Sequence, residues 1–202
     1  LMESLTKAIV KRTKLPVTVK TRLGWDQASI KIIEVAERLQ DAGCRAIAIH
    51  GRTRAQMYKG EADWTYIEKV KNNQRMHIPV FANGDINTPE KAQQIKTLGL
   101  DGAMIGRASI GNPWFFNEVK HFLKTQKHLP PATISERVAM AKRHLEMAIE
   151  WKGERLGIYE TRRHYANYFK GIPDFKPYRQ KLVTSDEPKE VYSTLSKVLE
   201  VF

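Results

Sequence analysis

The stretch Ile78-Pro79-Val80-Phe81-Ala82-Asn83-Gly84-Asp85 decides the fold, together with its later counterpart Gly102-Ala103-Met104-Ile105-Gly106-Arg107. Each begins with apolar residues over the length of a strand and ends in glycine and polar residues, which predicts a strand, a turn and a helix. Two such turns suit a phosphate group, because glycine lets backbone N–H groups approach an anion and a helix N-terminus adds its dipole. Arg107 would supply a fork of donors. We therefore predict a phosphate-bearing ligand at the carboxyl edge of a parallel sheet.

The first part of the chain alternates between predicted helices and predicted strands. Hydrophobic spacing predicts strands over 16–20, 46–50, 78–82 and 101–105. It predicts helices over 2–14, 29–39 and 64–71, one that begins with Thr88 as N-cap and Pro89 at its first position, and one that opens near residue 112. Apolar strands separated by helices indicate the α/β class, with a parallel sheet covered on both faces.

The character of the chain changes at Leu129-Pro130-Pro131-Ala132-Thr133, beyond which no strand pattern occurs. Helical spacing predicts helices over 135–151, 155–170 and 188–201. We therefore expect two domains, an α/β domain over 1–128 and a small all-helical domain over 132–202.

The chain is basic. Among its 202 residues, 34 Lys and Arg stand against 22 Asp and Glu, which gives a formal net charge of +12 and favours a polyanionic partner such as nucleic acid. Residues 151–181 are especially basic, with eight Lys or Arg and three acids. Bases and aromatics alternate over 162–170, as on a nucleic-acid surface, but Tyr165, Tyr168 and Phe169 also have the spacing of a helix core. We leave both interpretations open for the aromatics and favour the surface role for the arginines.

Several classes of protein are excluded by what the sequence lacks. Cys44 is the only cysteine, so there is no disulfide framework and no Cys-based metal site, and a small buried filler is its expected role. A His/Glu metal triad, a Walker sequence and a GxSxG elbow are absent, which argues against zinc hydrolysis, P-loop chemistry and an α/β-hydrolase. We expect no metal. No run approaches about 18 apolar residues and no signal-peptide pattern occurs, so we expect a cytoplasmic protein.

Each predicted strand ends in charged or hydrogen-bonding residues. The four ends read Lys20-Thr21-Arg22, His50-Gly51-Arg52, Asn83-Gly84-Asp85 and Gly106-Arg107. Singly, His50 would more often be a structural histidine and Arg52 a surface ion pair. Because ligands of α/β sheets and barrels gather at the carboxyl ends of strands, four such ends predict one site. A phosphorylated, conjugated cofactor fits this site, since Lys20 could stabilise negative charge on a ring, as a reduced flavin requires.

These residues resemble those of the tRNA-dihydrouridine synthases, and the bacterial B-type subfamily is the most similar. The resemblance rests on Pro16-Val17-Thr18-Val19-Lys20-Thr21-Arg22, Ile49-His50-Gly51-Arg52-Thr53, Val80-Phe81-Ala82-Asn83-Gly84-Asp85-Ile86, Met104-Ile105-Gly106-Arg107-Ala108 and Gly111-Asn112-Pro113-Trp114. It implies an FMN-binding TIM barrel followed by a helical tRNA-binding domain. It also implies reduction of uridine in tRNA, in which FMN takes hydride from NADPH and a cysteine acts as general acid.

The resemblance further implies roles for individual residues. Lys20 and His50 would contact the flavin. The ribityl phosphate would lie against Asn83, Gly84, Asp85, Gly106 and Arg107. The basic helical segment would bind the tRNA backbone, with Arg162, Arg163, Lys170 and Arg179 as its candidate contacts.

The chain departs from the family's pattern in the number of strands. A TIM barrel has eight βα units, whereas this sequence predicts four strands, which match the family's last four. The Asn-x-Gly-Cys-Pro segment that carries the family's catalytic cysteine does not occur in these residues, and Cys44 lies in a different motif. We therefore assign no catalytic residue and expect this chain alone not to reduce uridine. A half barrel exposes two strand edges, so we also expect self-association.

Three alternative functions stay open. An FMN-barrel oxidoreductase acting on a small molecule would have no use for the basic tail and would lack salt-sensitive tRNA binding. A non-catalytic tRNA-binding module would bind tRNA without any flavin. A stand-alone four-stranded α/β phosphate binder would have an open sheet and would be a stable monomer.

Overall fold

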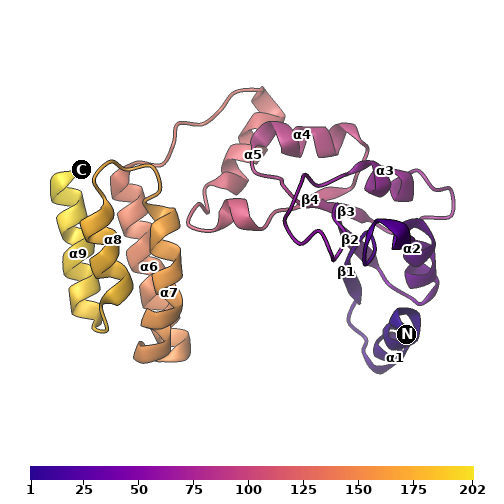
Figure 1. Cartoon of the computed structure of the whole chain (residues 1–202), viewed down its shortest axis with the longest axis horizontal. Helices are drawn as coiled ribbons and strands as arrows, with labels where there is room; N and C mark the ends of the chain where they lie inside the picture. The colour runs from indigo at the N-terminus through magenta and orange to yellow at the C-terminus, as the bar shows by residue number, and fades with distance from the viewer. The chain divides into compact units, whose positions relative to one another are not determined.

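The computed structural model describes all residues from 1 to 202, and the chain forms two compact units (Figure 1). The first unit is Leu1–Ala108 and the second is Ser109–Phe202, and each has buried apolar residues of its own. None of the helices combines the length and the apolar composition that crossing a membrane requires.

The first unit is built from four parallel strands in the order β1-β2-β3-β4. The structure therefore confirms the α/β class with a parallel sheet. In chain order its elements are α1 (Met2–Arg12), β1 (Thr18–Arg22), the 3-10 turn η1 (Gln27–Ser29), α2 (Ile32–Asp41), β2 (Ala46–His50), α3 (Thr65–Lys71), β3 (Val80–Asn83), α4 (Pro89–Thr97) and β4 (Gly102–Met104). A second 3-10 turn, η2 (Arg107–Ser109), follows β4.

One face of the sheet carries the core of this unit. Ile47 and Ile49 of β2 pair in register with Val80 and Ala82 of β3, and all four side chains are fully buried. Strands that pair only with their neighbours in sequence are joined by crossovers of the same hand, which place the connecting helices on the same face. Figure 1 shows α2, α3 and α4 on one side of the strands. The expectation that helices cover both faces is therefore wrong for this unit.

The ends of the elements follow from local chemistry. β1 begins after Pro16, which has no N–H to give to a ladder. α2 starts three residues later than expected, because Asp26 and Ser29 form a capping box that closes η1 first. The predicted cap of α4 is confirmed, since the Thr88 hydroxyl accepts a hydrogen bond from the Lys91 N–H at 3.3 Å.

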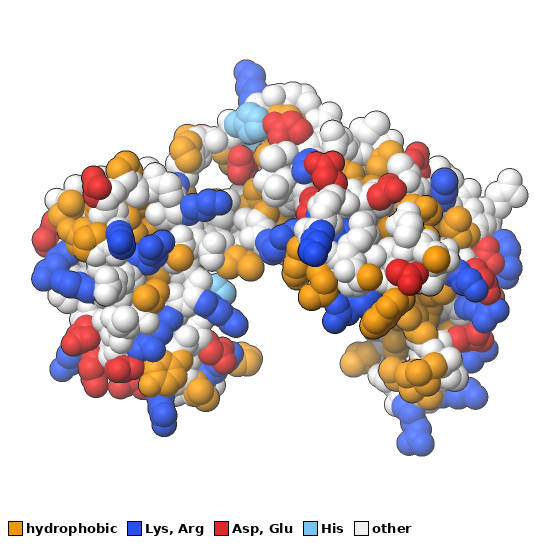
Figure 2. All heavy atoms as spheres, viewed as in Figure 1, with side chains coloured by type: hydrophobic (Ala, Val, Ile, Leu, Met, Phe, Trp, Pro, Cys, Tyr) orange, Lys and Arg blue, Asp and Glu red, His pale blue; other side chains and the backbone are white.

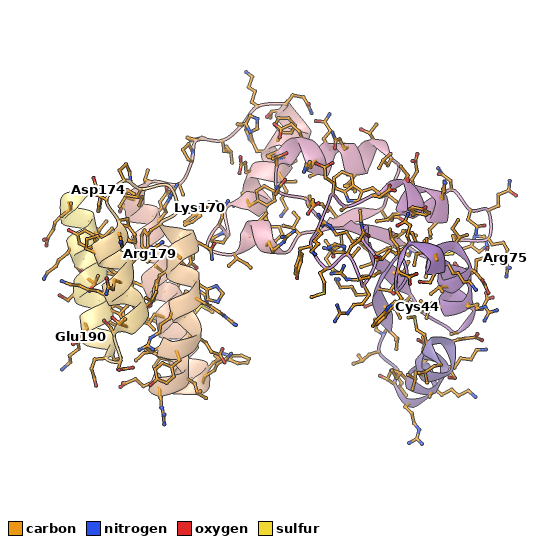
Figure 3. The ribbon with its side chains drawn as sticks, in the orientation of Figure 1. Cys44, Arg75, Lys170, Asp174, Arg179 and Glu190 are labelled. Atoms are coloured by element: carbon orange, nitrogen blue, oxygen red, sulfur yellow. The ribbon has the colours of Figure 1, made fainter.

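Cys44 is buried in the connection between α2 and β2, where Figure 3 labels it. Its thiol donates to the Ala46 carbonyl at 3.0 Å. The role of a small buried filler is confirmed.

The second unit is all-helical. Its helices are α5 (Phe115–Thr125), α6 (Ile134–Lys152), α7 (Glu154–Tyr168), α8 (Lys176–Thr184) and α9 (Pro188–Val201). Their shared core includes Val138, Leu145, Tyr165, Leu182 and Leu195. α8 was not predicted, because Leu182 is its only buried residue and so short a polar helix carries no clear hydrophobic period.

The two compact units divide between residues 108 and 109, whereas the sequence places the domain boundary at 128–132. The segment before α5 belongs with the helices because it packs on them. Trp114 lies against the helical core. Gly111 approaches the backbone of α7 so closely that a Cβ there would lie 2.6 Å from both Asn167 Cβ and the Tyr168 nitrogen.

Candidate functional site

The register of the sheet brings the strand-end residues onto the face opposite the apolar core. Arg22 pairs in register with His50, and His50 pairs with Asn83. Asn83 pairs in turn with Met104, and its side-chain nitrogen donates to the Met104 carbonyl at 2.7 Å. Lys20 precedes Arg22 by two residues, so both side chains point to the same face of β1. The structure therefore places Lys20, His50 and Asn83 on one face of the sheet, with Lys20 two residues before the end of its strand.

Arg52 and Asp85 form a buried, two-pronged ion pair at this edge. The guanidinium of Arg52, whose side chain is 3% exposed, donates to the two carboxylate oxygens of Asp85 at 2.6 and 2.9 Å. The Ala62 N–H donates to the same carboxylate at 2.9 Å. Burial by itself raises the pKa of Asp85, but these hydrogen bonds and the charges of Arg52 and Arg107 outweigh it and hold that pKa below its ordinary value. The interpretation of Arg52 as a surface ion pair is wrong, because the pair is buried.

Arg107 also binds Asp85, with 3.0 Å between its guanidinium and the carboxylate. The Arg107 side chain is 59% exposed, so part of its fork faces solvent. Asp85 is ionised and can only accept hydrogen bonds, so it repels a phosphate rather than binding one. In this geometry Asp85 orients two arginines, and Arg107 is the group that could meet an anion.

Gly84 is held in a conformation that only glycine adopts easily. Its φ is +106°, and a Cβ would lie 2.8 Å from the Ala62 Cβ and 3.1 Å from the His50 Cε1. Its carbonyl accepts a hydrogen bond from the Trp64 indole at 3.1 Å. The space beside Gly106 is open, since nothing lies within 4 Å of where a Cβ would be. A ligand could therefore approach the backbone at Gly106 more closely than at Gly84.

His50 is the buried titratable group of the site. It is 7% exposed, and its Nδ1 is buried with no hydrogen-bond partner in the protein. Burial, followed by the charges of Arg22, Lys20 and Arg52, lowers its pKa from 6.5 to about 4. The ring is therefore neutral at pH 7. Burial, with the charge of Arg22, also lowers the pKa of Lys20 below its ordinary value.

A loop over residues 53–60 lies across this edge and is held there by hydrogen bonds to arginines. Arg22 donates to the carbonyls of Thr53 and Met57 at 2.8 and 3.0 Å. Arg52 donates to the carbonyls of Lys59, at 3.2 Å, and Gly60. The loop is thus fastened by two strand-end arginines. The only signal in the sequence is that those arginines end two adjacent strands.

The aromatic residues of α7 belong to the core of the helical unit. Tyr165, Tyr168 and Phe169 are all buried. Of the two interpretations left open for them, the core is correct. Their spacing follows the helix period because all three rings face the core.

The four basic residues suggested for RNA contact differ in exposure. Arg162 is turned inward: one of its nitrogens donates to the carbonyls of Thr184 and Ser185 and to Asp186, at 3.1, 2.7 and 2.6 Å. The other three, Arg163, Lys170 and Arg179, are exposed. Lys170 follows α7 and Arg179 lies on α8, as Figure 3 labels them. The structure thus leaves three of the four able to meet a polyanion. It contains no group of three or more His, Cys, Asp or Glu side chains placed to hold a metal ion.

Comparison with known proteins gives a family match along almost the whole chain. The family described as dihydrouridine synthase matches residues 1–201. A probable tRNA-dihydrouridine synthase 1 of Synechocystis is 42% identical over 98% of this chain and 55% of its own length. The tRNA-dihydrouridine synthase B of Pseudomonas putida is 41% identical over 90% of this chain and 53% of its own length. A probable tRNA-dihydrouridine synthase of Rickettsia conorii is 35% identical over 98% of this chain.

The chain spans about half the length of the curated relatives it matches. Among solved structures, a mandelate oxidase mutant with (S)-mandelic acid aligns with 96% of this chain and 59% of its own at 16% identity. Its TM-score of 0.37 is too low to bear on the fold or the function.

Proposed function

The chain belongs to the dihydrouridine synthase family, and from that premise we propose that it is the C-terminal part of a flavin-dependent enzyme that reduces uridine in tRNA. The observation that carries the proposal is the edge formed by Arg22, His50 and Asn83, which are neighbours in register on three adjacent strands. The cationic side chains of Lys20 and Arg22, the neutral imidazole of His50 and the exposed Arg107 all lie within the first unit.

FMN fits the residues at this edge. The buried Nδ1 of His50 has no partner in the protein, and a buried polar atom of this kind calls for a ligand. The open space beside Gly106 leaves room for a group against the backbone. Arg107 offers the exposed part of its guanidinium fork to a phosphate.

Each residue then has a distinct task. Arg107 would bind the phosphate, with Asp85 holding its guanidinium in place, and Gly106 would allow close approach of the backbone. Asn83 would fix the ends of β3 and β4 through its bond to Met104. Lys20 would place a positive charge beside the flavin ring, where the chemistry supplied by bound FMN is hydride transfer from NADPH to uracil.

The four strands would form half of an eight-stranded barrel. The sequential order β1-β2-β3-β4, with helices on one face, is the arrangement that a (βα)8 barrel repeats. The other half would supply the general acid, because Cys44 is buried away from the strand ends. On this proposal the chain alone does not reduce uridine.

The helical unit would bind tRNA through its exposed bases. Arg163, Lys170 and Arg179 are the candidates, whereas Arg162 stabilises the junction between α8 and α9. A tRNA substrate also implies a cytoplasmic protein. The basic tail favours this function over an oxidoreductase that acts on a small molecule.

The test is a titration of the purified chain with FMN, with riboflavin as the phosphate-free control. We expect FMN to bind more tightly than riboflavin. Arg107→Gln should weaken FMN binding about tenfold or more, the value of a lost charge-assisted contact, and leave riboflavin binding unchanged. Arg75→Gln is the matched control, because Arg75 is 64% exposed and pairs with Glu37 and Asp41, away from the strand ends (Figure 3).

Equal affinity for FMN and riboflavin would overturn the phosphate site. If neither ligand binds, the titration is repeated with the upstream half of a curated relative fused before residue 1. Failure of that fusion to bind would overturn the flavin proposal. tRNA binding by a chain that never binds flavin would instead support the non-catalytic module.

A further inference from the structure

Tyr58 is an exposed aromatic residue among the arginines of the site. The residue is 60% exposed, although it belongs to the loop that the arginines hold across the strand ends. The Arg107 guanidinium lies over its ring at 4.6 Å from the centroid, and that of Arg22 lies at 6.0 Å. A tyrosine this exposed is not part of the buried core.

The loop holds Tyr58 in a fixed place. The residues on either side of it, Met57 and Lys59, each give a carbonyl to a strand-end arginine, at 3.0 and 3.2 Å. Met57 has a φ of +53°, a left-handed turn that redirects the chain just before the tyrosine. The ring is therefore presented at the edge of the site by a backbone anchored on both sides.

The surroundings of Tyr58 are cationic. Residues 53–60 contain Arg54 and Lys59 and no acid, and the buried Arg52 that precedes them is paired with Asp85. A guanidinium can stack on an aromatic ring with its flat face while its in-plane N–H groups stay available to anions. Arg107 can thus contact Tyr58 and a phosphate at once. Exposed rings interleaved with bases are the means by which proteins hold single-stranded nucleic acid.

We propose that Tyr58 is a stacking platform for a nucleobase of the RNA substrate, next to the uridine that is reduced. The inference rests on the function proposed above. An enzyme that acts on a base inside a folded RNA must take that base out of its stack, so a neighbouring base loses a stacking partner. The exposed part of the Tyr58 ring would replace that partner, with Arg22 and Arg54 facing the adjacent phosphates.

The experiment measures binding of an unmodified tRNA transcript to the whole chain by fluorescence anisotropy, over a series of salt concentrations. Tyr58→Leu should weaken binding roughly tenfold, the range for loss of one base–aromatic stack. Tyr58→Phe keeps the ring and should bind like the unchanged chain. Tyr66→Leu is the matched control, because Tyr66 lies on α3 and the cation over its ring, at 5.4 Å, is Lys69 rather than an arginine of the site.

The salt series separates stacking from a general disturbance of the site. Loss of a stack should leave the slope of log affinity against log salt unchanged, because no phosphate contact is removed. A shallower slope for Tyr58→Leu would mean that the arginines had moved, and would overturn the platform. Equal affinity of Tyr58→Leu and the unchanged chain would overturn it while leaving the proposed function intact. Failure of the unchanged chain to bind tRNA would overturn both.

Discussion

Asp85 is the residue on which the arginines of the site converge. It accepts hydrogen bonds from Arg52, Arg107 and the Ala62 backbone, so one carboxylate fixes two cations from two different strand ends. A buried pair of this kind contributes little net stability compared with apolar residues of the same size, but it sets geometry. Asp85, the acidic residue of the Asn83-Gly84-Asp85 turn, therefore holds Arg52 and Arg107 in place.

The pH dependence of stability should report the burial of His50. In the unfolded chain the pKa of His50 is its ordinary 6.5, whereas in the folded protein it is lowered to about 4. The unfolded state therefore binds more protons between these values, and the free energy of unfolding should fall as pH decreases from 6.5 to 4, by up to roughly 3 kcal/mol. The measurement is the urea midpoint against pH.

The variant His50→Gln should lose that part of the pH dependence. His144 and His164, whose pKa values are also lowered by burial, remain in both proteins, so the difference between the two curves isolates His50. Parallel curves from pH 7 to pH 4 would show that the ring is accessible to protons in the folded state.

At the scale of the element, β1 and β4 each pair with one strand only, which leaves two unpaired edges in the sheet. Unpaired edges promote pairing between chains. We expect the purified chain to self-associate as its concentration rises, as followed by sedimentation velocity. A single monomeric species at every concentration would contradict this.

The edge of β1 offers a direct test. The Arg45 N–H donates to the Val17 carbonyl at 2.8 Å, so the backbone of Val17 faces β2 and that of Thr18 faces the unpaired edge. Thr18→Pro removes an outward N–H without removing a bond of the ladder, and proline is tolerated at the first residue of an edge strand. We expect this variant to fold normally and to self-associate less.

The sequence could predict elements whose signals are local. The cap at Thr88, the strand at 46–50 and the helix at 188–201 appear where hydrophobic spacing and capping chemistry put them. α8 was missed because tertiary packing at Leu182, and not its own period, holds it in place. A sequence pattern also cannot show that helices share one face, since that depends on strand order.

The residues of the site also fall into those that the sequence can predict and those that it cannot. Lys20, His50 and Asn83 could be brought together from the sequence, because parallel strands end at one edge. The bond from Asp85 to Arg52 spans 33 positions and no spacing rule predicts it. No pattern in the sequence singles out Tyr58, because the arginines that lie over its ring come from β1 and from the end of β4.

At the scale of the whole molecule, the candidate flavin site lies within the first unit and the exposed bases suggested for RNA lie in the second. Figure 2 shows Lys and Arg side chains over both units on the face in view, with acids among them. On this face the basic side chains are dispersed and do not form one continuous patch.

Flavin binding and RNA binding should respond to different substitutions. The double variant Lys170→Gln, Arg179→Gln should weaken tRNA binding. The slope of log affinity against log salt should become shallower by the amount expected for the loss of about two phosphate contacts. FMN affinity should not change. The control is Arg75→Gln with Lys96→Gln, two exposed bases of the first unit. Weaker FMN binding in the first variant would show that the two activities are not separable.

The sequential strand order has a consequence for folding of the protein during its synthesis on the ribosome. Every strand pairs only with the strand before or after it in the chain, so each pairing is complete once one crossover has been synthesised. The sheet can therefore grow one strand at a time as the chain emerges, without waiting for distant segments. The newest strand has an unpaired edge until the next crossover and strand have been synthesised. The speed of translation through each crossover would then set how long that edge can pair with another chain.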